Sequence, residues 1–221
     1  MADEEFRRVL VWSGWLRFSH LCIGLSVIVL LLTGWLTAES PLLAEEAMDI
    51  HYLAASFLLF GLALRIMLMV FGQTNDRLMS LIPRRSELKA IGQTVLFYLS
   101  LGKRELPRWY GHNPLWKLVY LLIFTGLAIQ ILTGALMREQ LLFYGLYLPS
   151  IHQFWAKTLL WISGLHILAV VLHDLKGRGS DISGIINGYR LFFVDRSQGA
   201  VTDDPSVQYV SMEGLKSNKG K

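Results

Sequence analysis

Cysteine and proline are scarce in this chain. Its 221 residues include one cysteine and six prolines. A single cysteine, Cys22, cannot form an internal disulfide, a thiolate-bound iron–sulfur cluster or the two-thiol attachment of a c-type haem. We therefore interpret Cys22 as a small buried apolar residue, and any redox centre in this chain would have to be held by histidine.

Charged residues are also few, at 17% of the chain against 53% hydrophobic residues. The hydrophobic residues gather in four blocks, each long enough for the roughly 20 helical residues that cross about 30 Å of hydrocarbon. These blocks are residues 16–37, 51–72, 115–137 and 151–173. The first block follows a polar head and lacks a small-residue cleavage pattern, so it does not look like a cleaved signal peptide. The sequence predicts an all-α integral membrane protein with a four-transmembrane-helix bundle.

Lysine and arginine are nearly absent from the two short loops between the predicted spans. The 38–50 loop has neither and carries four acidic residues, and the 138–150 loop has only Arg138. The N-terminal head, the long 73–112 connection and the segment after the last span are all basic. The positive-inside rule then places both termini in the cytoplasm. The net charge of +4 reflects this topology, and we expect contact with membrane lipid and no nucleic-acid binding.

Two further segments are candidates for cytoplasmic interfacial helices. Residues 86–101 mix apolar and polar side chains at helical spacing, which is typical of a helix at the membrane surface. Residues 181–193 are a second, weaker candidate. We assign residues 1–196 to one membrane domain. Residues 197–221 are rich in Gly, Ser and Lys, and we interpret them as a polar cytoplasmic tail with a disordered end.

The spacing of four histidines within the predicted spans indicates a redox cofactor site. His152 and His166 are 14 residues apart in one predicted span, which is about 21 Å along a helix with an angular offset of about 40°. The alternating direction of the spans puts His20 at the depth of His166 and His51 at the depth of His152. A lone intramembrane histidine is more often a hydrogen-bonded structural residue or part of a proton path. Four histidines in two level pairs favour a di-haem domain in which each iron binds two imidazoles.

Two arginines lie near the inner histidine level. Arg65 follows His51 by 14 residues, so the two share a helix face, and a buried guanidinium needs a partner. A haem propionate would pair with Arg65, and the alternative is an arginine that extends to the cytoplasmic surface. Arg17, one turn before His20, is a weaker candidate of the same kind.

Glycine occupies matching places in the first and third spans. The stretches LLLTGWL and QILTGAL share a Leu-Thr-Gly pattern, and Gly34 lies 14 residues after His20. Gly34 and Gly134 would let a flat porphyrin approach the backbone closely. The alternative is ordinary packing of small residues between membrane helices.

The predicted inner edge of the bundle holds further polar and aromatic candidates. If His173 were a ligand, the inner haem would leave the hydrocarbon, so we place His173 near a haem propionate or a quinone, with a plain interfacial role as the alternative. Tyr120 could line the inner haem or a quinone pocket, although a tyrosine there is more often an interfacial anchor. His112 precedes Asn113-Pro114, a common helix start that leaves the role of His112 open.

Several motifs together resemble one known family. They run from the first span to the tail: Arg17-Phe18-Ser19-His20, His51 with Arg65, GHNPL at 111–115, His152 through His166, and ISGIINGYR at 182–190. In these motifs the chain resembles the di-haem cytochrome b subunits of membrane-bound nickel–iron hydrogenases. Their superfamily also holds the b-type subunits of formate dehydrogenase and thiosulfate reductase. The histidines are typical of the superfamily, and GHNP and NGYR indicate the hydrogenase branch.

The resemblance implies two haems b on the four histidines, a bacterial inner-membrane location and a role in electron transfer. A hydrogenase large subunit outside the membrane would oxidise hydrogen, and its iron–sulfur small subunit would pass electrons to the outer haem. The inner haem would reduce a quinone near the cytoplasm, with His173, Asp174 and Tyr120 as candidate proton donors. Another donor enzyme in place of the hydrogenase is the first alternative. A haem-free anchor or transporter is the second, although transporters usually need more spans.

Overall fold

The computed structural model describes residues 5–176, 181–194 and 207–210. Four long helices form its body: α1 (Gly14–Glu39), α2 (Ala44–Phe71), α4 (Pro114–Leu136) and α5 (Leu148–Lys176). Each is long and apolar enough to cross a membrane. The four predicted spans are therefore confirmed, and the chain is an integral membrane protein.

Polar residues extend the long helices beyond the predicted apolar blocks. The Ser13 side chain caps α1 by accepting a hydrogen bond from a backbone N–H of the first turn, at 3.1 Å. Helix α2 begins well before residue 51, with Glu45 and Glu46 in its first turn, where negative side chains stabilise the positive end of the helix dipole. Asn113 caps α4 as predicted, through its side-chain oxygen.

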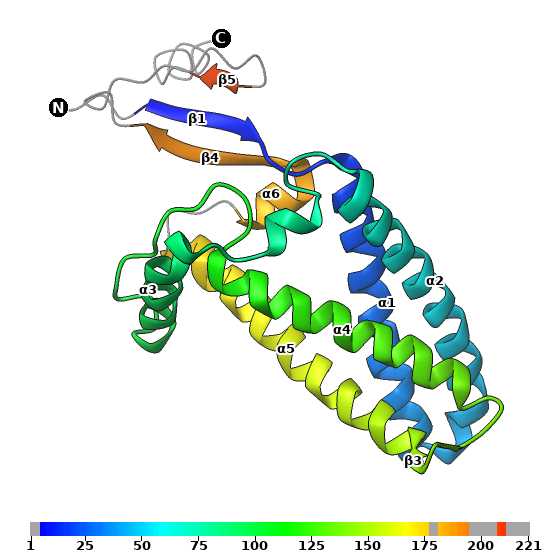
Figure 1. The fold of residues 1–221 in the computed structure, drawn as a ribbon. Coiled ribbons are helices and arrows are strands. Elements are labelled where there is room, and N and C mark those ends of the chain that lie inside the picture. The colour runs from blue at the N-terminus through cyan, green and yellow to red at the C-terminus, as the bar shows by residue number, and fades with distance from the viewer. Residues whose placement is uncertain (1–4, 177–180, 195–206, 211–221) are drawn as a thin grey trace, which may run out of the picture.

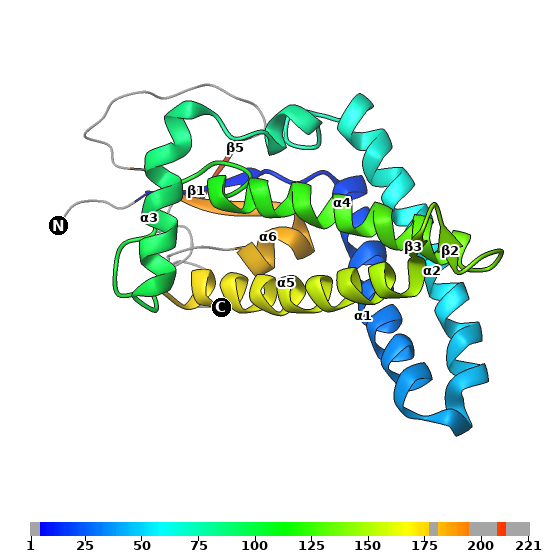
Figure 2. The same ribbon diagram turned by 60° about the horizontal axis from the view of Figure 1, so that its bottom comes forward.

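Two helical hairpins pack against each other. Helix α1 lies along α2, and α4 lies along α5 (Figures 1 and 2). The core between the hairpins consists of Leu58, Leu62, Leu127 and Leu159. Small residues permit the close helix crossings, because a Cβ added to Gly126 would lie 2.8 Å from the Trp155 ring.

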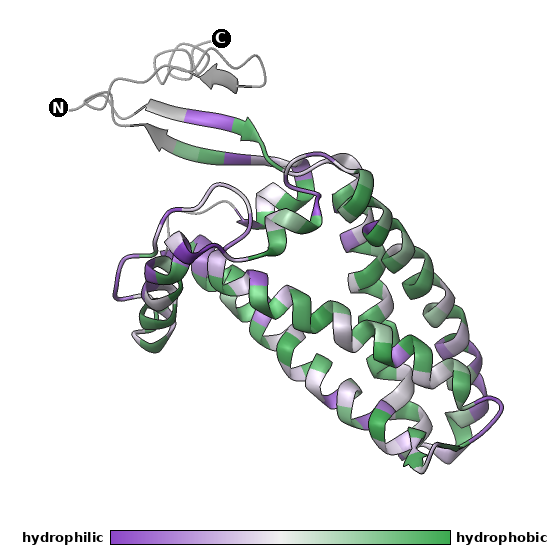
Figure 3. Cartoon of the chain, in the orientation of Figure 1, coloured by the Kyte–Doolittle hydropathy of each residue, from purple (hydrophilic) through white to green (hydrophobic). Residues whose placement is uncertain are grey.

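The outward faces of the long helices are apolar, as the hydropathy colours of Figure 3 show. Leu25, Ile66 and Trp161 are each more than half exposed on these faces. Water-soluble monomers rarely expose apolar surface over such an extent. These faces are therefore suited to contact with lipid.

The long connection between α2 and α4 contains helix α3 (Leu88–Leu99), which confirms a helix within the predicted 86–101 segment. Two 3-10 turns precede it: η2 (Leu78–Leu81) and η3 (Arg85–Glu87). After α3, Gly102 takes a φ of 77°, a conformation that glycine adopts without strain. An ion pair of 2.6 Å between Glu87 and Lys117 ties this connection to α4. Figure 2 shows α3 crossing the ends of α4 and α5 rather than extending the bundle.

A small antiparallel sheet, which the sequence analysis did not anticipate, lies at one end of the bundle. Strand β1 (Glu5–Leu10) is central, between β4 (Tyr189–Val194) and β5 (Val207–Val210). The β1–β4 register pairs Arg8 with Leu191. Since the strands come from distant parts of the sequence, no local pattern indicated their pairing. We call this end of the bundle the sheet end (Figure 1).

The predicted interfacial helix over residues 181–193 is wrong in its second half. Residues Asp181–Asn187 form helix α6, but Gly188 then takes a φ of 89° and the chain continues as β4. Aromatic residues after Gly188 favour a strand, and β1 provides the partner. Of the predicted tail, the structure describes only β5, so the predicted disorder at its end lies outside the described residues.

The opposite end of the bundle carries the two short connections. A 3-10 turn, η1 (Pro41–Leu43), joins α1 to α2. Strands β2 (Leu142–Phe143) and β3 (Leu146–Tyr147) form a small hairpin between α4 and α5. Its turn residues Tyr144 and Gly145 both have positive φ. We call this the hairpin end.

Candidate functional site

Two pairs of histidines face each other across the bundle. His51 of α2 and His152 of α5 have ring centroids 6.4 Å apart, with the ring planes at 56°. His20 of α1 and His166 of α5 have ring centroids 6.3 Å apart, with the planes at 55°. We call these the hairpin-end pair and the sheet-end pair. The histidines come together in the pairs that their depths predicted, and that they bind iron stays a prediction.

The separations within the pairs fit a metal ion held between two imidazoles. A metal–nitrogen bond of about 2 Å, with the ring nitrogen about 1 Å from the ring centroid, places two axial imidazoles roughly 6 Å apart. Among the described residues, no group of three or more His, Cys, Asp or Glu side chains is placed to hold a metal ion. Two facing imidazoles at this separation suit a haem, whose porphyrin supplies the other iron ligands.

The predicted glycines lie beside the hairpin-end pair. A Cβ added to Gly34 would lie 3.7 Å from Cε1 of His51, and one added to Gly134 would lie 3.4 Å from Cε1 of His152. These are contact distances for a single methyl group, so a longer side chain at either position would crowd the imidazole. A close approach of porphyrin to these glycines stays a prediction.

Two threonines that sequence reasoning missed contact the same pair. Thr33 Oγ1 lies 2.8 Å from Nδ1 of His51, and Thr133 Oγ1 lies 2.8 Å from Nδ1 of His152. Each threonine directly precedes one of the predicted glycines. The shared Leu-Thr-Gly pattern was the signal that could have found them.

Aromatic side chains of α4 surround the sheet-end pair. The rings of Trp116 and Tyr120 contact His166, with centroid distances of 5.0 and 6.2 Å. Tyr120 therefore lies at the level of His20 and His166, where the sequence placed it. Nδ1 of His166 is buried and has no hydrogen-bond partner among the described residues. His166 thus differs from both histidines of the hairpin-end pair in the surroundings of its Nδ1 atom.

Arg65 is buried inside the bundle rather than extended to solvent. Its side chain is 5% exposed, and a guanidinium N–H donates to the backbone carbonyl of Asp76 at 2.6 Å. The guanidinium also lies over the Phe124 ring, 5.7 Å from its centroid. The described partner of Arg65 is therefore a carbonyl in the turn after α2, and pairing with a propionate stays a prediction.

Arg17 connects α1 to the segment that follows α5. Its guanidinium donates a hydrogen bond to the backbone carbonyl of Ile186, at the end of α6. A Cβ added to Gly188 would lie 3.3 Å from the Arg17 Nε. The structure therefore gives Arg17 a packing role at the sheet end, and a propionate contact stays a prediction.

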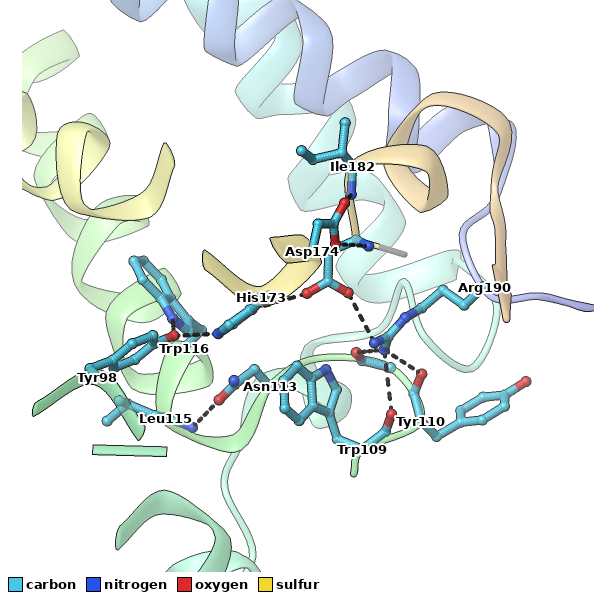
Figure 4. Close-up of polar contacts among 12 residues, drawn as sticks. Tyr98, Trp109, Tyr110, Asn113, Leu115, Trp116, His173, Asp174, Ile182 and Arg190 are labelled. Atoms are coloured by element: carbon cyan, nitrogen blue, oxygen red, sulfur yellow. Dashed lines mark hydrogen bonds and ion pairs between the residues drawn. The ribbon is translucent and has the colours of Figure 1, made fainter. Parts of the chain in front are cut away.

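His173 is the centre of a polar network at the sheet end (Figure 4). It is 2% exposed, and both ring nitrogens have partners. Nε2 lies 2.7 Å from the Tyr98 hydroxyl, and Nδ1 lies 3.0 Å from an Asp181 carboxylate oxygen. Trp116 donates its indole N–H to the same Tyr98 oxygen at 2.6 Å. Arg190 pairs with the other Asp181 oxygen at 2.9 Å.

Burial and charge set the protonation of this network. Burial raises the pKa of the Tyr98 hydroxyl to about 12, so it stays protonated. Burial would also raise the pKa of Asp181, but the hydrogen bond from His173 and the charge of Arg190 outweigh it and lower that pKa. Asp181 is therefore a carboxylate at neutral pH, and it accepts from His173.

Asp174, a predicted proton donor, caps a helix. Its two carboxylate oxygens accept hydrogen bonds from the backbone N–H groups of Asp181 and Ile182, at 2.7 and 3.0 Å. These N–H groups begin α6 and have no partner within that helix. By accepting these two hydrogen bonds, Asp174 stabilises the first turn of α6.

His112, whose role the sequence left open, is packed in a buried cluster. Its ring lies 4.8 Å from the Trp12 ring and 5.6 Å from the Tyr120 ring, centroid to centroid. Burial, together with the neighbouring cations, lowers the pKa of His112 to about 3. The imidazole is therefore neutral at physiological pH, and it packs against the residues that line the sheet-end pair.

Comparison with known proteins gives one family and several relatives. A family model described as prokaryotic cytochrome b561 matches residues 11–188. A probable Ni/Fe-hydrogenase B-type cytochrome subunit of Azotobacter vinelandii is 29% identical over 227 residues, covering 88% of this chain and 94% of that protein. The protein of the same name in Azotobacter chroococcum mcd 1 is 30% identical, with the same coverage. That of Cupriavidus necator is 24% identical, covering 86% and 90%. No solved structure matches the chain significantly.

Proposed function

This chain belongs to the prokaryotic cytochrome b561 family, and we propose that it connects a nickel–iron hydrogenase to the quinone pool through two haems b. Membership of this family implies b-type haem, as the motifs predicted. The relatives' printed names support the hydrogenase as the electron donor. The hydrogenase small subunit would deliver the electrons, and the large subunit would carry out the hydrogen chemistry.

The observation that carries the proposal is the presence of two facing histidine pairs, with centroid separations of 6.4 and 6.3 Å. On α5, the two ligands are 14 residues apart, or about 21 Å along the helix axis. Bound haem would supply reversible one-electron transfer. His20 with His166, and His51 with His152, would each hold one haem through two imidazoles, which would leave no open iron site for oxygen or substrate.

The distribution of basic residues supports one orientation in the membrane. The sheet end carries the basic connections, so we place it in the cytoplasm of a bacterial cell, with both termini. The hairpin end would then face the outside of the inner membrane. There η1 and the β2–β3 hairpin would lie nearest to the iron–sulfur small subunit.

The network around His173 supports quinone reduction at the sheet end. Reducing a quinone to a quinol consumes two protons with two electrons, so the site needs a proton supply. His173 holds one ring nitrogen against the Tyr98 hydroxyl and the other against the Asp181 carboxylate. If His173 takes up a proton, the Asp181 carboxylate would stabilise the imidazolium, and Nε2 would donate to the Tyr98 oxygen as the Tyr98 hydroxyl gives its own proton onward. Tyr98 in turn contacts Trp116, which packs on His166.

Haem content tests the proposal directly. We expect the purified parent protein to hold two haems b per chain by the pyridine haemochrome assay. Replacing any one of His20, His51, His152 or His166 by alanine should remove haem, whereas His112→Gln should keep both. A parent without haem would refute the di-haem assignment.

The electron donor needs a separate test. In membranes that contain the assembled hydrogenase complex, hydrogen should reduce the haems, as seen in their absorption spectrum, and should also reduce the quinone pool. Deleting the hydrogenase small subunit should abolish that reduction while dithionite still reduces the haems. Unchanged reduction by hydrogen would contradict the proposed donor, and reduction by formate instead would favour the alternative.

A further inference from the structure

The two hairpins of the bundle repeat one contact at the hairpin-end pair. In the first, Thr33 of α1 reaches Nδ1 of His51 at 2.8 Å. In the second, Thr133 of α4 reaches Nδ1 of His152, also at 2.8 Å. The same contact therefore forms twice, from separate helices, in both histidines of one pair.

The direction of these hydrogen bonds follows from the other partner of each hydroxyl. The Thr33 hydroxyl donates to the Val29 carbonyl at 2.8 Å, and the Thr133 hydroxyl donates to the Ile129 carbonyl at 2.7 Å. A hydroxyl has a single proton to donate. Because that proton goes to the helix backbone, the threonine oxygen accepts from the imidazole. Nδ1 must then carry hydrogen, and Nε2 is left free to bind iron.

The backbone contact alone is common in helices, and it does not explain the contact with histidine. Thr37 of α1 and Thr125 of α4 make the same backward bond, to the carbonyls of Thr33 and Leu121, and neither hydroxyl has a hydrogen bond to a histidine of the described chain. The feature specific to Thr33 and Thr133 is the histidine Nδ1 on the other side of the oxygen.

The sheet-end pair has no equivalent support at His166. Nδ1 of His166 is buried and lacks a hydrogen-bond partner in the described parts of the chain. An acceptor on Nδ1–H makes the opposite nitrogen a stronger donor to a metal. A stronger donor stabilises the oxidised iron and lowers its reduction potential. On this reasoning the hairpin-end pair, with an acceptor at both Nδ1 atoms, would hold its iron at a lower potential than a pair in which His166 lacks one.

We propose that Thr33 and Thr133 are positioning residues for the hairpin-end haem, which fix the tautomer and plane of His51 and His152 and lower the potential of that haem. This inference rests on the proposed function, in which each histidine pair binds one haem. A lower potential at the hairpin end favours electron movement towards the sheet end. That is the direction from the proposed hydrogenase to the proposed quinone site.

Valine variants test the hydroxyl without changing the side-chain shape. Thr33→Val and Thr133→Val should each raise the midpoint potential of one of the two haems and leave the other unchanged. They should also weaken retention of that haem by about 10- to 100-fold, the usual loss when the hydrogen-bond partner of a metal-binding histidine is removed. The low-field g value of the ferric form should change as well, since it depends on the angle between the imidazole planes.

Matched variants separate positioning from folding. Thr37→Val and Thr125→Val remove a backward hydrogen bond to the helix backbone from threonines that have no hydrogen bond to a histidine among the described residues. Both variants should have the haem midpoint potentials of the parent. Thr33→Ser and Thr133→Ser keep the hydroxyl and should restore the parent potential and g value. The measurements are an optical redox titration, electron paramagnetic resonance and haem content of the purified full chain.

Each outcome decides the inference. If the parent holds two haems and the valine variants have the parent's midpoint potentials, the role of the threonines is overturned. The proposed function is then unaffected. Serine variants that behave like the valine variants would also overturn it, because the hydroxyl would then not be the cause. A parent without two haems would refute the proposed function and this inference together.

Discussion

Asp181 joins three parts of the sheet end, so its charge should matter for stability. One carboxylate oxygen lies 3.0 Å from His173 Nδ1, and the other lies 2.9 Å from an Arg190 guanidinium nitrogen. The side chains of these two partners are 3% and 9% exposed. Asp181→Asn keeps the shape of the side chain and removes the charge. Arg190 would then lose its charged partner and keep neutral ones, which include the backbone carbonyls of residues 109–111 and the Trp109 ring.

The expected loss follows from the two charge-assisted bonds. A hydrogen bond to a charged group contributes about 1.5–3 kcal/mol, and asparagine retains one acceptor oxygen. We expect the free energy of unfolding to fall by about 2–3 kcal/mol, since a buried guanidinium is also left with weaker partners. For a chain of this size that is a decrease in Tm of roughly 4–12 °C. Thermal unfolding in detergent at pH 7, followed by tryptophan fluorescence, measures it.

The pH dependence supplies a sharper test of the same prediction. The pKa of Asp181 is lowered in the folded protein, below the ordinary value of about 4. A carboxylate of this kind stabilises the fold above its unfolded pKa and loses that contribution as pH falls through its folded pKa. The difference in Tm between parent and variant should therefore be full at pH 7 and should narrow below about pH 4.

Glu139→Gln, which neutralises an exposed carboxylate at the other end of the bundle, is the matched control and should melt like the parent. The reasoning is refuted if Asp181→Asn melts with the parent at pH 7. It is also refuted if the difference between them persists unchanged in acid, because the charge would then not be its source.

Two further predictions concern the same end and the helix crossing. His173→Gln should slow quinone reduction severalfold, as measured by quinol formation, while haem content shows that both haems remain. Loss of a haem in this variant would show instead that His173 is a ligand. Gly126→Ala should lower the free energy of unfolding by about 1–3 kcal/mol through overpacking, because its Cβ would lie 2.8 Å from the Trp155 ring. Gly164→Ala, with nothing within 4 Å of the added Cβ, should melt at or above the parent temperature, and equal losses in both variants would contradict the packing argument.

Helical periodicity made the histidine levels predictable. An α-helix rises by about 1.5 Å per residue, so the depth of His20 or His166 follows from its place within an apolar block. Two side chains on neighbouring spans can come into contact only if they lie at the same depth along those spans. Helical spacing likewise put Tyr120 at the level of His20 and His166, and its ring contacts that of His166.

The partners of the polar side chains were not predictable in the same way. Nothing in its segment indicated that the Asp174 carboxylate caps α6, and its predicted role as a proton donor stays a prediction. It did not connect His173 to Asp181, because the segment 181–193 was assigned to a membrane-surface helix without a place in the bundle. Nor did it find the sheet, since β1 and β4 are separated by the whole membrane domain.

The sequence by itself determined the membrane class, the four spans and the two levels of histidine, because apolar length and helical rise are local properties of a chain. The tertiary structure alone decided which polar atoms touch. The contact of Thr33 with His51 requires a particular rotation of α1 against α2, and the contact of His173 with Asp181 requires the chain to fold back after α5. Such contacts depend on how helix surfaces pack together, and no spacing within a single segment contains that information.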